Sequence, residues 1–179
     1  MTKLSENLPI EEARERLRQL ISELAVVRGH VVLASGKEAD YYVDLRRITL
    51  HHEASRLVGQ VMLDLLDKNG IEFEAAGGLT MGADPVGTAI MRAAGDQDRA
   101  IDAFVVRKAQ KSYGMGRQVE GPSVEGRRVV AVEALRKAGA EVVAVAVIVD
   151  RATGAKEHVE EVAGVPCLYA YSKDELGLD

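Results

Sequence analysis

Val142-Val-Ala-Val-Ala-Val-Ile-Val149 is the stretch that decides the fold, because every residue in it is apolar. A strand with one face on a core and one face in water would carry a polar residue at every second position. An unbroken apolar run instead predicts a strand that is buried on both faces, which is typical of a parallel sheet covered by helices. The run therefore points to an α/β protein.

Helical and strand patterns alternate on both sides of this run. Apolar residues at helical spacing predict helices at 10–24, 54–66, 85–94, 134–138 and 157–163. Short apolar runs predict further strands at 73–77, 101–106, 128–132 and 167–171. Two short strands around 31–33 and 41–43, joined by a turn at 35–37, predict a hairpin, and Ser172-Lys-Asp-Glu175 predicts a capping box. We expect one α/β domain over 1–179 with a mainly parallel sheet.

The loops that follow the predicted strands are the places to look for a site. In open parallel sheets, ligands bind beyond the carboxyl ends of the strands. The loops after Gly77, Val106, Val132 and Val149 should therefore share one edge of the sheet.

One connection is too short for this arrangement. Only about ten residues separate the strand near Val129 from the strand that starts near Val142. A parallel crossover needs roughly a dozen or more, usually with a full helix. The segment from Ala134 to Gly139 predicts only the C-terminal half of a helix, with Gly139 as its stop. We infer that a loop is absent between 129 and 134, either disordered and omitted or deleted. The alternative is an antiparallel pair with a short helical link.

Composition excludes several classes of protein. The formal charge of −5 argues against a general nucleic-acid binder. No run of about 18 apolar residues exists to span a membrane, and the N-terminus has no apolar signal core. Cys167 is the only cysteine and lies in an apolar run, so we expect a buried structural thiol in a protein of the reducing cytoplasm.

Four segments, in their order and spacing, resemble the orotate phosphoribosyltransferase family in its actinobacterial-like form. They are Leu33-Ala-Ser-Gly-Lys-Glu-Ala-Asp-Tyr-Tyr-Val-Asp-Leu-Arg46, Gly77-Gly-Leu-Thr-Met-Gly-Ala-Asp-Pro-Val86, Phe104-Val-Val-Arg-Lys-Ala-Gln-Lys-Ser-Tyr-Gly114 and Val149-Asp-Arg-Ala-Thr-Gly154. The first and third segments are fairly specific, whereas the second and fourth would be weak on their own.

The resemblance implies both a fold and a reaction. Members of the family have a type I phosphoribosyltransferase fold with a small hood, here expected from about 1–50 and the C-terminal segment. They transfer ribose 5-phosphate from phosphoribosyl diphosphate to orotate in pyrimidine (UMP) biosynthesis, which gives orotidine 5′-monophosphate and diphosphate. Mg²⁺ assists and is expected to be held mainly by substrate. They work as homodimers, in which a loop, here about 107–121, closes over the partner's site.

Cations of this loop are the candidate contacts of the phosphoribosyl diphosphate. Arg107, Lys108 and Lys111 follow a predicted strand in a glycine-rich segment. Positive charge there would neutralise a departing diphosphate while the loop excludes water. The resemblance makes all three donor contacts, with Lys111 catalytic; the alternative is a solvated basic loop. Tyr113 stands where relatives usually have His, and it can donate a hydrogen bond but carries no positive charge near neutral pH. Relatives also often have one Lys where Ala34 stands and another where Met81 stands.

Arg151 is the candidate contact of orotate. The resemblance pairs an Arg at this place with the orotate carboxylate, which a guanidinium can bind through two parallel hydrogen bonds. The alternative is a surface Arg at a strand end. Tyr41 and Tyr42 match an aromatic pair near the orotate pocket. Because neighbouring strand residues point to opposite faces, we expect one to face the base and the other the core.

The family also says what should fill the short connection. In relatives, two adjacent acidic residues and a Thr- and Gly-rich turn hold the ribose hydroxyls and the 5-phosphate at this point. Glu133 is either the first of these acids or part of the next helix, and we favour the helix. Two other functions stay open on the same scaffold: a regulator that binds phosphoribosyl diphosphate, and an inactive relative. His51 and His52 are adjacent on a predicted helix start, so we do not expect a metal pair.

Overall fold

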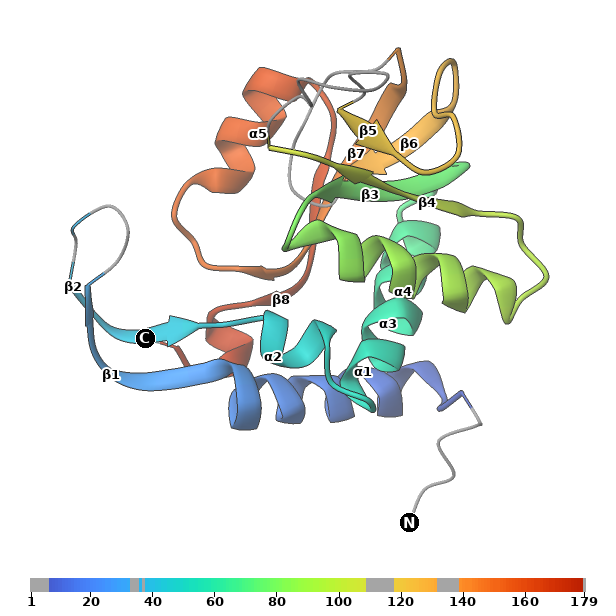
Figure 1. Ribbon diagram of the computed structural model, residues 1–179. Coiled ribbons are helices and arrows are strands. Elements are labelled where there is room, and N and C mark those ends of the chain that lie inside the picture. Colours follow the sequence, from blue (N-terminus) through green and yellow to red (C-terminus); the bar gives the residue numbers. More distant parts are fainter. Residues whose placement is uncertain (1–6, 33–35, 37, 109–117, 132–138, 179) are drawn as a thin grey trace.

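A six-stranded sheet forms the centre of the protein in the computed structural model, which describes residues 7–32, 36, 38–108, 118–131 and 139–178. The strand order is β5-β4-β3-β6-β7-β8. The strands are β3 Ala75–Leu79, β4 Asp102–Val106, β5 Val119–Glu120, β6 Arg128–Ala131, β7 Glu141–Asp150 and β8 Cys167–Ser172. All neighbours pair in parallel except β5, which runs antiparallel to β4 (Figure 1). The predicted α/β fold is confirmed.

The apolar run lies between β6 and β8, as a doubly covered strand should. Ala144, Ala146 and Ile148 belong to the main core on one side of β7, and Val145 belongs to a smaller cluster with Cys167 on the other side. β6 pairs in parallel with β7, with Arg128 opposite Glu141. The antiparallel alternative for this pair is therefore wrong, and a parallel crossover has to fit within 132–140.

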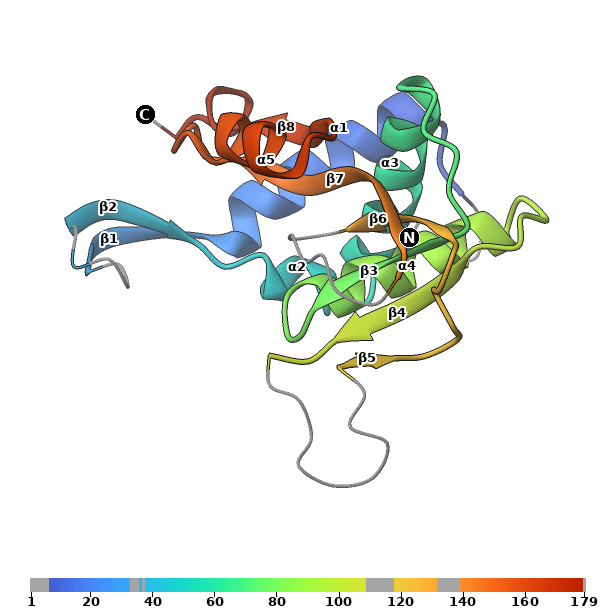
Figure 2. The same ribbon diagram turned by 90° about the horizontal axis from the view of Figure 1, so that it is seen from above.

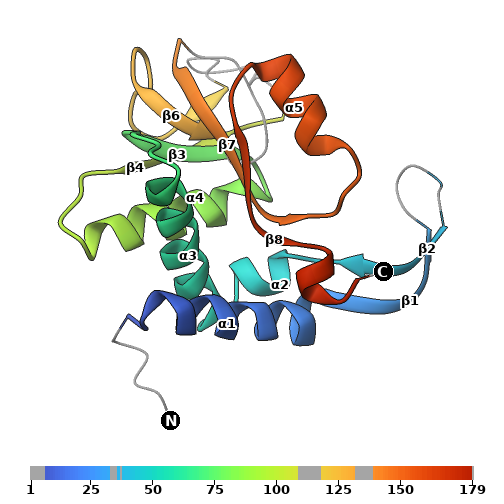
Figure 3. The same cartoon turned by 180° about the vertical axis from the view of Figure 1, so that it is seen from behind.

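Helices cover both faces of the sheet. α3 (Ala54–Lys68) and α4 (Ala83–Gly95) pack on one face, and α1 (Ile10–Leu20) packs against α3 from outside. α5 (Ala155–Ala163) packs against β7 and β8 from the opposite side (Figure 3). α3 and α4 approach closely at Gly59, where an added Cβ would lie 2.2 Å from the carbonyl oxygen of Ala89.

The predicted hairpin is present and extends away from the sheet (Figure 2). Its strands are β1 Val26–Val32 and β2 Glu38–Val43. β1 begins as soon as a short π-helical turn, η1 (Ile21–Ala25), ends the first helix, so the strand is longer than its apolar core suggested. The turn predicted at 35–37 falls largely outside the described residues, as does the helix predicted at 134–138.

Boundaries and two short elements differ from the sequence predictions. β3 lies two residues later than predicted, because Gly77 and Gly78 continue the strand beside β4, where an added Cβ on Gly77 would lie 2.0 Å from the Phe104 carbonyl oxygen. The prediction missed α2 (Arg46–Thr49) and the two-residue strand β5, which are too short to show a period.

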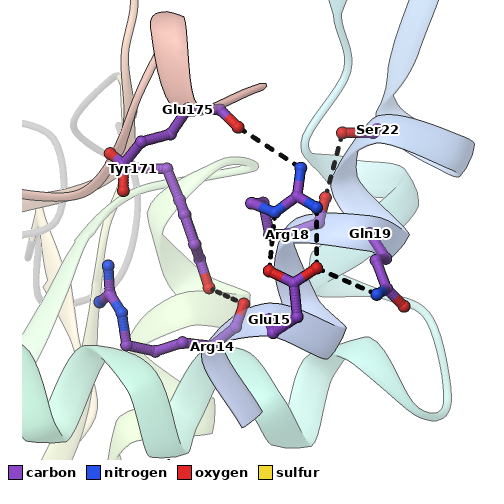
Figure 4. A network of polar contacts seen from close by, with 7 residues as sticks. All are labelled: Arg14, Glu15, Arg18, Gln19, Ser22, Tyr171 and Glu175. Carbon is purple, nitrogen blue, oxygen red and sulfur yellow. Dashed lines mark hydrogen bonds and ion pairs between the residues drawn. The ribbon is translucent and has the colours of Figure 1, made fainter. Parts of the chain in front are cut away.

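The C-terminal segment docks on α1 through Tyr171, which is 2% exposed. The Tyr171 hydroxyl donates to the Arg14 carbonyl oxygen at 2.8 Å (Figure 4). The Arg14 guanidinium lies over the Tyr171 ring and donates to the Ala170 carbonyl oxygen, also at 2.8 Å. Burial raises the pKa of Tyr171. At the end of β8, Ser172 exchanges the two hydrogen bonds of the predicted capping box with Glu175. A 3₁₀ turn, η2 (Asp174–Leu176), starts there.

Candidate functional site

A hollow of about 560 Å³ opens at the carboxyl edge of the sheet. Its walls come from the turn after β3, from the loop between β7 and α5, from the end of β2 with the start of α2, and from Lys108 beyond β4. Three of the four loops predicted to share this edge therefore meet there. The fourth, which follows β6, lies outside the described residues.

The hollow adjoins the point where the strand order reverses. From β3 the chain moves through α4 to β4 on one side, and the later strands β6, β7 and β8 continue on the other side. Loops leave β3 and β6 in opposite directions at such a point, which creates a crevice beyond their carboxyl ends. β3 and β6 are the neighbouring strands at this point, so the carboxyl end of β6 lies beside the place where the chain reverses.

Arg151 comes directly after β7 and lines the hollow. Its loop is shaped by Asp150, whose Oδ1 accepts the Ala152 N–H at 3.0 Å, and Ala152 takes a left-handed φ of 52°. The Arg151 side chain makes no hydrogen bond or ion pair with any residue that the structure describes. Its guanidinium is exposed and free to bind a ligand.

Tyr42 and Tyr41 point to different surroundings, as the alternation of a strand predicts. Tyr42 lines the hollow, whereas Tyr41 packs against the main core. Only Tyr42 is therefore in position to contact a ligand there.

The two described cations beyond β4 differ in the same way. Lys108 is exposed and lines the hollow, but Arg107 does not. Arg107 instead forms an ion pair of 3.2 Å with Glu120 of β5, and its backbone N–H donates to the Gln118 carbonyl oxygen at 2.8 Å. These contacts anchor the start of the 107–121 loop to β5. Lys111 and Tyr113 lie outside the described residues.

Sequence reasoning missed two cations of the hollow, Arg46 and Lys156. Arg46 Nε donates to Asp44 Oδ1 at 2.8 Å, and this hydrogen bond lowers the pKa of the Asp44 carboxyl. Lys156 pairs with Glu160 one helical turn later at 3.0 Å, which raises the pKa of the lysine. The sequence Asp44-Leu-Arg46 lay inside a segment already singled out, but nothing in it showed that β2 would end at the hollow.

The described lining is rich in positive charge. Arg46, Lys108, Arg151 and Lys156 face only two carboxylates, Asp44 and Asp150, and each carboxylate already accepts a hydrogen bond from its own loop. Such a lining favours an anionic ligand.

The lining of the hollow also includes a cysteine, Cys167. Cys167 is 5% exposed and its backbone N–H donates to Glu160, and burial raises the pKa of the thiol, which agrees with the predicted structural role. Among the described residues, His, Cys, Asp and Glu form no group of three that could hold a metal ion. Within the same residues, no helix is long and apolar enough to cross a membrane.

The known proteins that are similar to this chain in sequence and in structure share one family. No family model matches the chain. The chain is 59% identical to the orotate phosphoribosyltransferase of Streptomyces coelicolor, over 94% of this chain and 99% of that protein. It is 50% identical to that of Corynebacterium glutamicum, over 98% and 100%. The crystal structure of the Mycobacterium tuberculosis enzyme in complex with 5-phospho-α-D-ribosyl 1-diphosphate has a TM-score of 0.76 at 44% identity, over 93% of this chain and 99% of that one.

The aligned lengths of these matches exceed the number of residues that this chain contributes to them. The Streptomyces match extends over 182 aligned positions but includes only 94% of the 179 residues of this chain, about 168. About 14 of the aligned positions therefore have no residue in this chain. The Corynebacterium match extends over 190 positions and includes 98%, about 175, which leaves about 15. Two relatives thus agree on the size of a shortfall in this chain.

Proposed function

Because the chain belongs to the orotate phosphoribosyltransferase family, we propose that the hollow at the carboxyl edge of its sheet is where orotate and phosphoribosyl diphosphate meet. The enzyme transfers ribose 5-phosphate from phosphoribosyl diphosphate to orotate, giving orotidine 5′-monophosphate and diphosphate. The observation that carries the site is its lining: four cations around a hollow that adjoins the reversal of strand order. A regulator that only binds the donor is not favoured, since the curated relatives are transferases.

Orotate binds at the β7 end of the hollow. The Arg151 guanidinium, free of contacts with the described residues, pairs with the orotate carboxylate through two parallel hydrogen bonds. Tyr42 borders the base from β2. Tyr41 supports this wall by packing against the core on the other side of the strand, so its part is structural.

The diphosphate of the donor binds at the β4 end. Lys108 faces the hollow and supplies charge directly, and Arg107 holds the root of the loop on β5 through Glu120. Lys111 and Tyr113 reach the diphosphate from the loop, with Lys111 the catalytic cation. Opposite charge placed where the diphosphate gains charge stabilises the transition state more than the ground state.

The reaction is a displacement at the anomeric carbon of the ribose. The bond from this carbon to the diphosphate oxygen breaks as the bond to the orotate nitrogen forms, through an oxocarbenium-like transition state. No side chain of the described lining is needed as a covalent nucleophile. The protein orients the two reactants and offsets the charge that moves to the leaving group.

The loop that binds the ribose 5-phosphate belongs between these two ends of the hollow. We propose that this loop is absent from the printed sequence and would stand somewhere between residues 129 and 134. Three observations support this. β6 and β7 are parallel neighbours with a connection of only 132–140, β6 ends at the reversal point, and two relatives have about 14 to 15 aligned positions that this chain lacks. Glu133, outside the described residues, stays assigned to the following helix. An intact protein heavier than the 19.3 kDa of the printed sequence would mean that the loop exists; a mass of 19.3 kDa would mean that it is deleted.

Mg²⁺ is the proposed cofactor, and the described lining fits an ion held mainly by substrate oxygens. Mg²⁺ usually takes one or two carboxylates together with phosphates and waters. Asp150 is the carboxylate of the lining best placed for this, because Asp44 is engaged by Arg46. When bound, the ion would offset charge on the diphosphate.

We also propose a homodimer in which the loop about 107–121 serves the partner's site, and a cytoplasmic location. The ion pair between Arg107 and Glu120 holds the two described ends of this loop together on the sheet. The lone, unpaired thiol of Cys167 suits a reducing compartment.

Replacement of the loop lysine tests the catalytic assignment. Lys111→Ala should abolish most formation of orotidine 5′-monophosphate while leaving the thermal unfolding midpoint nearly unchanged. Lys68→Ala, an exposed lysine on α3, is the matched control and should keep native turnover. Native turnover in Lys111→Ala would remove Lys111 from the mechanism.

A further inference from the structure

Asp44 and Arg46, which we call the Asp44–Arg46 pair, line the hollow from the hairpin side. Neither residue contacts the orotate carboxylate or the diphosphate as placed above. The backbone around the pair fixes its position: the Asp44 N–H donates to the Ala25 carbonyl oxygen at 2.9 Å, and the Asp44 carbonyl oxygen accepts the Arg47 N–H at 3.2 Å. Ile48 is fully buried and holds α2 in the main core. The pair is therefore in place before any ligand arrives.

The pair has hydrogen-bonding groups to spare within the described part of the chain. The Nε and the backbone N–H of Arg46 both donate to Asp44 Oδ1, at 2.8 Å and 3.3 Å. Asp44 Oδ2 accepts no hydrogen bond from any described residue, and the two terminal nitrogens of Arg46 donate none to these residues. The hydrogen bond from Arg46 lowers the pKa of the Asp44 carboxyl, so the group is ionised near neutral pH and can only accept. The pair thus presents a free acceptor beside free N–H donors.

An acceptor beside a donor is complementary to a ring N–H beside a ring carbonyl group. Orotate has such an imide edge, because its N3–H lies between the carbonyl groups at C2 and C4. The carboxylate of orotate is on C6, which is opposite N3 across the six-membered ring. With the carboxylate on Arg151, N3–H therefore points away from the end of β7. The Asp44–Arg46 pair reaches the hollow from a different part of the fold, the hairpin and α2 (Figure 1).

Tyr42 brings the ring to the same wall as the pair. Residues two apart in an extended chain point to the same side, and Tyr42 and Asp44 both line the hollow. A base that borders Tyr42 therefore has Asp44 as the next side chain along that side of the hairpin.

We propose that the Asp44–Arg46 pair binds the imide edge of orotate and thereby selects bases of the uracil type. Asp44 Oδ2 accepts N3–H, and a terminal nitrogen of Arg46 donates to the ring carbonyl oxygen beside it. A base of the cytosine type has no hydrogen on N3, so it turns a lone pair toward the carboxylate and is rejected. The proposal rests on the placement of orotate proposed above and adds the groups that choose the base.

Two analogues of orotate test the imide contact on the native enzyme. 3-Methylorotate has a methyl group in place of the N3 hydrogen, and 6-carboxycytosine has a lone pair at N3. A site built to bind an N–H rejects a substrate that lacks it, so kcat/KM for each analogue should be at least about a hundredfold below that for orotate at saturating phosphoribosyl diphosphate. Equal use of orotate and 3-methylorotate would overturn the proposal without the need for a variant.

Asp44→Asn tests whether Asp44 supplies the acceptor. The amide keeps the shape of the side chain but can turn its NH₂ group toward N3 of the base. The value of kcat/KM for orotate should fall roughly 10- to 100-fold, and the preference for orotate over 6-carboxycytosine should shrink at least about tenfold. Asp40→Asn, which changes an exposed carboxylate of β2 outside the lining, is the matched control and should keep the native preference. A native preference in Asp44→Asn would refute the role of this carboxylate.

Arg46→Gln separates the base from the diphosphate. If the guanidinium binds the ring carbonyl oxygen, this change should lower kcat/KM for orotate by about tenfold and leave KM for phosphoribosyl diphosphate within about twofold of the native value. Arg28→Gln, on the hairpin, is the control and should change neither value. A higher KM for phosphoribosyl diphosphate, with kcat/KM for orotate unaltered, would place Arg46 on the donor and overturn its part in base selection.

The outcomes separate the pair from the site itself. If Arg151→Ala loses the use of orotate while Asp44→Asn keeps the native preference, the Asp44–Arg46 pair is overturned and the site stands. Where turnover is too slow to measure, calorimetric titration with orotate and with 3-methylorotate gives the same comparison as a ratio of dissociation constants. A native chain that neither converts nor binds orotate would overturn the proposed function, and the pair with it.

Discussion

Removal of the Arg151 guanidinium should lower kcat/KM for orotate, and the size of the loss follows from the hydrogen bonds that the guanidinium would make. Arg151 lines the hollow and has no contact to lose in the free enzyme within the described residues, so the whole effect should appear on orotate. Hydrogen bonds to charged groups contribute about 1.5–3 kcal/mol, and each 1.4 kcal/mol corresponds to a factor of ten. Arg151→Ala should therefore lower kcat/KM for orotate roughly 10- to 150-fold.

Lysine at the same place should give an intermediate loss. Arg151→Lys keeps the charge but offers no second parallel hydrogen bond, so kcat/KM should fall by roughly tenfold. The assay is initial-rate formation of orotidine 5′-monophosphate over a range of orotate concentrations at saturating phosphoribosyl diphosphate. Arg28→Ala, an exposed arginine on the hairpin, is the matched control and should behave as the native enzyme.

A substrate without the carboxylate separates pairing from a general effect on the site. Uracil is orotate without its carboxylate, so Arg151→Ala should leave kcat/KM for uracil nearly unchanged. If kcat/KM for orotate is unaltered, or falls by the same factor for uracil, then Arg151 does not bind the orotate carboxylate.

Three further predictions concern the scaffold. Gly59→Ala should destabilise the fold by more than about 2 kcal/mol in urea unfolding, since its Cβ would meet the Ala89 carbonyl oxygen at 2.2 Å; native stability would contradict this close helix contact. Tyr171→Phe should cost about 1 kcal/mol by losing the hydrogen bond to Arg14, and an unchanged melting temperature would show that this bond contributes nothing. The hydrogen bond from Arg18 lowers the pKa of Glu15 from 4.5 to about 2, so the stability that Glu15 contributes is present above pH 4.5 and lost as the pH falls toward 2. In Glu15→Gln, the urea unfolding midpoint should therefore change less with pH over this range. A pH profile identical to that of the native protein would contradict this role of Glu15.

Much of the fold was predictable because it depends on long apolar patterns. The run 142–149 is the sheet strand that its composition predicts, and the period of 54–66 gives α3. α2 and β5 were missed because four or two residues show no period, and tertiary contacts decide them. The start of β1 at Val26 was missed because it follows the first helix with no turn residue between them.

The sequence predicted the edge of the sheet at which the hollow lies, but only some of the side chains that line it. The rule that ligands bind beyond strand ends placed Arg151 and Lys108 correctly at one hollow. It did not foresee that Arg107 turns to Glu120, since β5 was not predicted. Nor could it bring Arg46 to the hollow, because nothing local fixes where the hairpin lies against the sheet.

A crystal structure of the protein with orotidine 5′-monophosphate tests the central claim most directly. We predict the base beside Tyr42 with its carboxylate on Arg151, and the 5-phosphate beyond the end of β6, where we propose that a loop is absent. A base bound outside this hollow, or a carboxylate that contacts a different cation, would contradict the proposed site.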